Sequence, residues 1–80
     1  MGYHKVEIKK GILGEYSKIR EEFEELTDAV GQNNPILILV ELSDMIGAIE
    51  SYSKKWNISL LDIIEMNNRT KEAFKDGSRS

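Results

Sequence analysis

The chain has 80 residues, a formal net charge of −3 and no cysteine. This length predicts one domain over residues 1–80, with a modest core that gains stability by oligomerising. The lack of cysteine excludes disulfides, zinc–thiolate sites and thiol nucleophiles, and the acidic balance argues against nucleic acid as a partner.

No apolar run approaches the ~20 residues that span a membrane, and residues 1–5 lack the apolar segment of a secretory signal. We therefore expect a cytoplasmic protein without a membrane partner. Residues 1–10 alternate weakly and are expected to be extended or frayed, because Gly11 and Gly14 disfavour a helix there.

The first predicted helix begins at about Leu13 and ends at Gly31, which is expected to act as a left-handed cap. Apolar residues recur along it at spacings of three and four, which predicts one buried stripe on a charged helix. The members of that stripe are Leu13, Tyr16, Ile19, Phe23, Leu26 and Val30.

The second helix is predicted over residues 35–55, with Asn34 as its N-cap and Pro35 at its first position. Residues 36–40 are apolar on every side, which favours burial between several helices. Their β-branched content makes a strand the competing interpretation, but helical spacing continues to Tyr52 and favours a helix.

The third helix is predicted to begin after Ser59 as N-cap, with Asp62 completing a capping arrangement, and to end before a tail at residues 76–80. Its buried stripe is expected to comprise Leu60, Ile63, Ile64, Met66, Thr70 and Phe74. The predicted fold is all-α, with three helices per chain that oligomerise into four-helix-bundle-type packing as a homodimer or homotetramer.

Two acidic segments place carboxylates three positions apart, where helical neighbours share one face. For the first segment, residues 21–25, a solvated face is the simpler interpretation. The second pair, Glu41 and Asp44, sits in the most apolar run of the chain, which a solvated face does not explain.

If the two segments face each other, each like-charge contact at about 4 Å costs on the order of 4 kcal/mol at an effective dielectric of 20. Protonation or a cation must relieve that repulsion, and oxygen-only ligands favour Mg²⁺ or Mn²⁺ over zinc or copper. Di-iron bundles instead use Glu-x-x-His pairs. The single histidine, His4, lies outside both acidic segments, so a di-iron site is not expected.

The run Glu21-Glu22-Phe23-Glu24-Glu25, followed by Glu41-Leu42-Ser43-Asp44, resembles the EExxE…ExxD signature of the MazG-like all-α nucleotide pyrophosphohydrolases. The resemblance is to their short, single-domain bacterial and phage form, and it covers most of residues 11–79. It implies that Mg²⁺, or Mn²⁺, is bound by four carboxylates: Glu22, Glu25, Glu41 and Asp44.

The resemblance also implies an activity: water attacks a nucleoside triphosphate between its α and β phosphates, releasing the monophosphate and pyrophosphate, as in house-cleaning enzymes. The general base is expected among Glu21, Glu22 and Glu25. The residues expected to contact the substrate are Lys18, Asn67, Lys71 and Arg79. The alternative is a catalytically inactive interaction or nucleotide-sensing module of the same fold.

Overall fold

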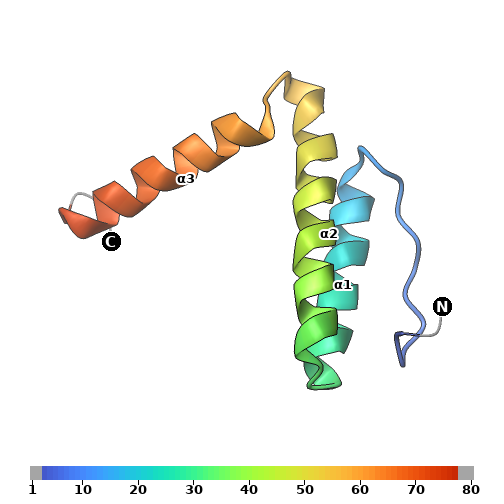
Figure 1. Ribbon diagram of the computed structural model, residues 1–80. Helices are drawn as coiled ribbons and strands as arrows, with labels where there is room; N and C mark the ends of the chain where they lie inside the picture. Colours follow the sequence, from blue (N-terminus) through green and yellow to red (C-terminus); the bar gives the residue numbers. More distant parts are fainter. Residues whose placement is uncertain (1–2, 78–80) are drawn as a thin grey trace.

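The computed structural model describes residues 3–77, which form an antiparallel helix pair with a third helix projecting from one end (Figure 1). The elements are α1 (Tyr16–Gly31), α2 (Pro35–Ser53), the short 3₁₀ helix η1 (Lys54–Trp56) and α3 (Leu60–Lys75). The all-α fold is confirmed. No strand occurs in the described range, which excludes the strand interpretation of residues 36–40. None of the helices within that range is long and apolar enough to cross a membrane.

Local capping signals set the starts of α2 and α3 as predicted. The Asn34 side chain accepts a hydrogen bond from the backbone N–H of Leu37 (3.1 Å), and Pro35 occupies the first helical position. Ser59 and Asp62 form a reciprocal capping box, with both hydrogen bonds at 3.1 Å. These two helices therefore begin where their sequences satisfy the unpaired N–H groups.

Two predicted helix ends are corrected. Gly31 belongs to the last turn of α1, and the left-handed residue of the following turn is Asn33, with φ of 54°. Asparagine tolerates this conformation better than most residues do. The α-helical part of α2 ends at Ser53 rather than at residue 55, because the chain tightens into η1 before the left-handed Asn57 ends it.

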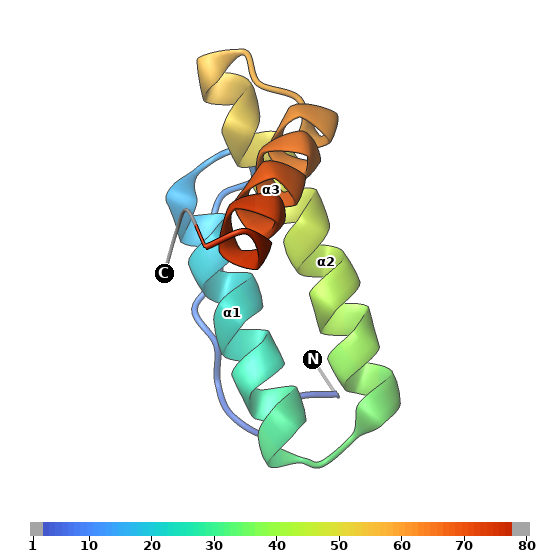
Figure 2. The same ribbon diagram turned by 90° about the vertical axis from the view of Figure 1, so that its left-hand side faces the viewer.

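The α1–α2 contact is narrow and is built from small side chains. Ala29 on α1 and Ala48 on α2 are buried, as is Leu37, and the two helices lie side by side (Figure 2). The other buried side chains of the pair include Glu21, Glu22 and Glu41. The face that joins the two helices is therefore partly acidic.

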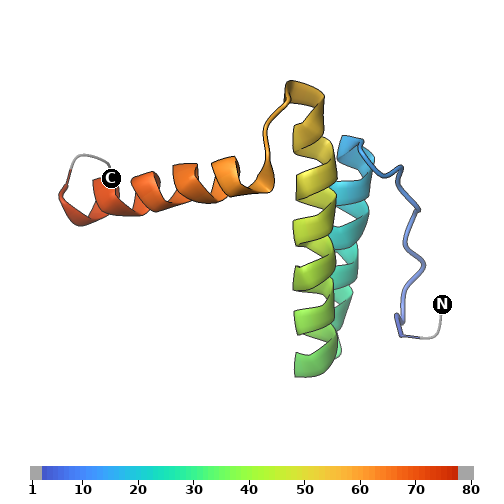
Figure 3. The ribbon, with the colours of Figure 1, turned by 45° about the horizontal axis from the view of Figure 1, so that its top comes forward.

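The predicted apolar stripes are not buried within one chain. On α1, Phe23 and Val30 are more than half exposed, and no residue of α3 is buried. The prediction assumed that the apolar face of each helix packs inside its own chain. Instead α1 and α2 meet through alanines and carboxylates, and α3 extends away from them, contacting only α2 (Figure 3).

The N-terminal segment, residues 3–12, is irregular and runs alongside the helix pair. The Gly11 N–H donates to Glu21 Oε1 (2.8 Å), the Lys5 N–H donates to Asp28 Oδ2 (3.0 Å), and Gln32 Nε2 donates to the Tyr3 carbonyl (2.7 Å). A side chain at position 11 would collide with the backbone of the first turn of α1. The segment is thus held against α1 at both of its ends.

Candidate metal centre

Four carboxylates from the two helices converge at the middle of the α1–α2 pair. Glu22 and Glu25 come from α1, and Glu41 and Asp44 come from α2. One oxygen of each lies within 4.8 Å of the others, which is close enough for all four to reach one cation. The structure therefore brings together the four residues that the resemblance assigned to magnesium.

Two of these carboxylates are buried without a full set of partners. Glu22 is 4% exposed and Glu41 is 3% exposed, and the Oε1 atom of each has no hydrogen-bond partner among the described residues. Leaving a buried charged oxygen unpaired is costly, and native proteins rarely do so without a ligand or water. The donor set, all carboxylate oxygen, suits a hard divalent cation such as Mg²⁺.

Crowding of negative charge is visible at Glu25. Burial, hydrogen bonds shared with Glu41 and Glu21, and the nearby charges of Glu22 and Glu41 raise the pKa of Glu25 to about 8. In the metal-free protein this carboxyl therefore retains its proton at neutral pH. A cation placed among the four oxygens would replace that proton.

Lys18 supplies a positive charge on the α1 side of the cluster. Its Nζ lies 3.0 Å from Glu22 Oε2 and 3.1 Å from Glu21 Oε1. Burial acts to lower the pKa of Lys18, but the two glutamates outweigh it and raise that pKa above its usual value. Within the chain, Lys18 pairs with carboxylates, and one oxygen of Glu22 remains for a cation.

Glu21 has a different environment from its neighbour Glu22. Burial favours its neutral form, but the Gly11 N–H and the Lys18 ammonium outweigh this and lower the pKa of Glu21. Its carboxylate holds the N-terminal segment and is not one of the four converging groups. Among the three candidate general bases, Glu21 is the one that lies outside the converging group, and both of its oxygens have partners in the chain.

His4 lies outside both acidic segments in the sequence, but the fold brings it against the cluster. His4 Nδ1 lies 2.8 Å from Asp28 Oδ2, and its Nε2 lies 3.0 Å from Glu41 Oε2 and 3.8 Å from Glu25 Oε1. Burial opposes the imidazolium, but hydrogen bonds to Asp28 and Glu41 outweigh it and raise the pKa of His4, and His4 in turn lowers the pKa of Asp28. His4 belongs to no predicted helix and lies 37 residues from Glu41 in the sequence. No local sequence pattern could therefore predict this contact.

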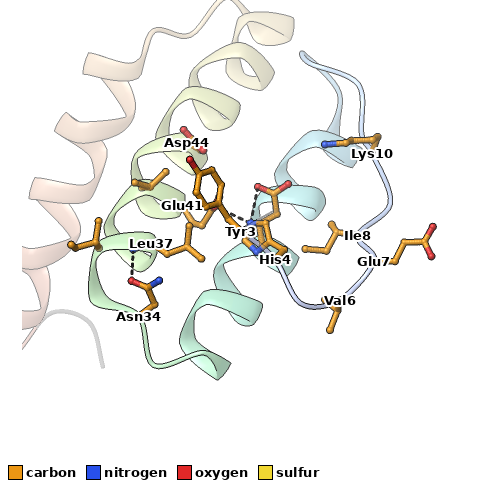
Figure 4. A pocket seen from close by; sticks show the side chains of 13 residues that line it. Tyr3, His4, Val6, Glu7, Ile8, Lys10, Asn34, Leu37, Glu41 and Asp44 are labelled. Atoms are coloured by element: carbon orange, nitrogen blue, oxygen red, sulfur yellow. Dashed lines mark hydrogen bonds and ion pairs between the residues drawn. The ribbon is translucent and has the colours of Figure 1, made fainter. Parts of the chain in front are cut away.

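A pocket of about 710 Å³ lies between the N-terminal segment and the two helices (Figure 4). Tyr3, Ile8 and Leu37 contribute to its apolar wall, and His4, Glu41 and Asp44 contribute polar groups. This volume is in the range that holds small organic ligands. The pocket opens directly onto the carboxylate cluster, since Glu25, Glu41 and Asp44 belong to both.

The remaining predicted substrate contacts lie elsewhere or cannot be placed. Asn67 and Lys71 are exposed on α3, and one chain does not bring them to the carboxylates. Arg79 lies outside the described residues. Tyr52 and Trp56 form an edge-to-face pair with ring centroids 4.9 Å apart at the end of α2.

No protein-family model, curated protein or solved structure matches this chain. A functional interpretation therefore depends on the acidic motif and on the geometry of the cluster.

Proposed function

We propose that this protein is a Mg²⁺-dependent pyrophosphohydrolase that cleaves nucleoside triphosphates to the monophosphate and pyrophosphate. The observation that carries the proposal is the pair of buried, unpartnered oxygens, Glu22 Oε1 and Glu41 Oε1, within a four-carboxylate cluster. Leaving these two oxygens without a partner in the described part of the chain costs stability, which is the usual signature of a site kept for function.

The chain's own residues have distinct parts in this proposal. Glu22, Glu25, Glu41 and Asp44 hold the cation, which lowers the pKa of bound water and offsets charge on the phosphates. Asp44 is the exposed member of these four acids, and it lines the pocket. The proton acceptor is Glu22 or Glu25, because these two belong to the converging group and Glu21 does not.

The substrate is proposed to enter the pocket beside the cluster. Its triphosphate would face the cation, and its base would face the apolar side formed by residues such as Tyr3, Leu37 and Val40. Asn67, Lys71 and Arg79 remain proposed phosphate contacts, supplied by α3 and the tail of a neighbouring chain. This arrangement requires an oligomer.

The surface of the chain supports an oligomer. It exposes 6329 Å², whereas a compact monomer of this mass exposes roughly 4,900 Å². The radius of gyration is 15.0 Å, against roughly 12 Å for a compact domain of this length. The excess surface is comparable to what each chain of a stable homodimer buries. We propose a homodimer or homotetramer in which helices of different chains form four-helix bundles.

The test is pyrophosphate release from each ribo- and deoxyribonucleoside triphosphate in Mg²⁺. The Glu22→Gln and Asp44→Asn variants should lose about 100-fold or more of kcat/KM, because each removes a metal oxygen or the base. Glu24→Gln is the matched control and should keep the wild-type kcat/KM, since Glu24 pairs with Arg20 and is not one of the four converging acids. No release above the Asp44→Asn background would overturn the proposal.

The alternative, a non-catalytic nucleotide-sensing or interaction module, has one observation in its favour. Lys18 and His4 already pair with the carboxylates, so the cluster is partly neutralised without metal. That alternative predicts ligand binding without turnover. A rise in Tm on adding Mg²⁺, combined with no pyrophosphate release, would favour it.

A further inference from the structure

The N-terminal segment places an imidazole against the carboxylate cluster. His4 is largely buried, and its Nε2 faces Glu41 Oε2 at 3.0 Å and Glu25 Oε1 at 3.8 Å. The three side chains come from three separate parts of the chain: the N-terminal segment, α1 and α2. Each offers one atom to a common point, since the three atoms lie within 4.8 Å of one another.

The orientation of His4 is fixed from its other side. Asp28 Oδ2 accepts from His4 Nδ1 (2.8 Å), from the Lys5 N–H (3.0 Å) and from Gln32 Nε2 (2.8 Å). An ionised carboxylate can only accept, so in the metal-free protein Nδ1 donates its proton to Asp28 and Nε2 donates its proton to Glu41. A metal at this position would take the place of the Nε2 proton and leave the hydrogen bond from Nδ1 to Asp28 in place. Metal-binding histidines are oriented in this way, with the nitrogen that does not bind metal donating to a carboxylate.

A second observation points to a ligand at the same place. Glu41 is 3% exposed, and its Oε1 has no partner in the described part of the chain, although Oε2 faces His4. Glu25 and Glu41 also belong to the all-oxygen group with Glu22 and Asp44. Glu25 and Glu41 therefore belong to two overlapping sets of potential metal ligands. One set contains only carboxylate oxygens, and the other includes the imidazole nitrogen of His4.

We propose that His4 Nε2, Glu25 and Glu41 form a binding position for a divalent first-row transition metal beside the all-oxygen magnesium position. Imidazole nitrogen favours such ions, whereas Mg²⁺ prefers oxygen and water. The position shares Glu25 and Glu41 with the site of the proposed function and rests on that proposal to this extent.

The test uses Mn²⁺ bound to the untagged, full-length protein and pulsed electron paramagnetic resonance. Because His4 is the single histidine of the chain, any imidazole coupling to Mn²⁺ must come from it. We expect ¹⁴N modulation of the Mn²⁺ signal, which changes to the ¹⁵N pattern when the protein is made with ¹⁵N-histidine. This measurement needs no substitution and cannot be lost through misfolding of a variant.

Affinities provide the second measurement. In His4→Gln the Kd for Mn²⁺ and for Co²⁺ should rise by about 10-fold or more, and the Kd for Mg²⁺ should change by less than about 3-fold. The matched control is Lys9→Gln, an exposed residue of the same segment, which should leave all three constants unchanged. Mn²⁺ binding without nitrogen coupling, or tighter binding in His4→Gln, would overturn the inference and leave His4 as a charge partner that metal displaces. Failure of Mn²⁺ to bind would overturn it as well.

The two proposals fail separately. Mg²⁺-dependent pyrophosphate release without nitrogen coupling would reject the His4 position alone. Nitrogen coupling without pyrophosphate release would reject the proposed function alone.

Discussion

Glu21 and Glu22 are adjacent and almost equally buried, yet they have different partners. Both oxygens of Glu21 face cations or an N–H: Gly11 and Lys18 contact Oε1, and Lys10 Nζ lies 3.6 Å from Oε2. Glu22 shares Lys18 but leaves Oε1 open to the cluster. Although they are neighbours on the helix, Glu21 therefore holds the N-terminal segment, whereas Glu22 faces the proposed metal position.

At the scale of single residues, Glu25 predicts how stability depends on pH. Its folded-state pKa of about 8 lies above the ordinary value of 4.5, so its stabilising contribution is present below about pH 4.5 and is lost as pH rises through about 8. We expect the Tm of the metal-free protein to fall between about pH 5 and about pH 9, and Glu25→Gln to reduce that fall. Thermal unfolding followed by circular dichroism would measure it.

The groups around Glu25 set the control for this experiment. The pKa of His4 is also raised, so its stabilising contribution is likewise lost as pH rises, and Glu25→Gln should reduce the slope without abolishing it. Glu24→Gln, on the exposed side of α1 beside Arg20, should keep the wild-type slope. Equal slopes in wild type and Glu25→Gln would contradict the interpretation. The charged groups that face Glu25 from the packed elements are His4, Glu21, Glu22, Glu41 and Asp44.

At the scale of elements, α1 and α2 are joined by a face with little apolar area. Ala29, Leu37 and Ala48 are the buried apolar residues of the described chain, and the carboxylates occupy the rest of that face. Local signals therefore contribute a larger share of the stability of this helix pair than in a well-filled core. The turn between α1 and α2 is where such signals concentrate.

Asn34→Ala should destabilise the helix pair by about 1 kcal/mol, because the Leu37 N–H loses its side-chain acceptor. For a domain of this size this corresponds to a Tm lower by roughly 4–8 °C. Asn33→Gly is the matched control in the same turn. Its backbone, with φ of 54°, suits glycine, so stability should be unchanged or slightly higher. Urea denaturation of both variants would measure their free energies of unfolding. Equal losses of stability in Asn34→Ala and Asn33→Gly would contradict the capping role.

At the scale of the whole molecule, a single chain leaves its most apolar surface uncovered. Leu39, Leu42 and Ile46 lie at positions of α2 that share a face, and all three are exposed. Contiguous apolar surface of this kind marks an interaction site in soluble proteins. A second copy of the chain, which has the same apolar faces on α1 and α3, is the partner we propose.

Light scattering coupled to size-exclusion chromatography should return an even multiple of the chain's mass. Leu39→Glu should shift that mass toward the monomer, because it places a charge in the apolar face. Leu39→Met, which keeps the same face apolar, should keep the oligomer. A monomeric wild-type protein at micromolar concentration would refute the proposed assembly.

The sequence by itself determined the helices and the pairing of acids along them. The caps at Asn34 and Ser59, and the spacing of Glu22 with Glu25 and of Glu41 with Asp44, are local patterns that depend on residues within one or two turns. Periodicity predicted buried apolar stripes, which one chain does not bury. It carried no information on which partner covers them.

Tertiary structure alone decided which faces meet and what else reaches the cluster. The α1–α2 pair could have joined through Phe23 and its apolar neighbours. It joins instead through Ala29, Ala48 and the acids, which leaves the apolar faces outward. His4 reaches the carboxylates because an irregular segment folds back along the helices, and such a path depends on long-range contacts at Gly11 and Asp28 rather than on any local pattern.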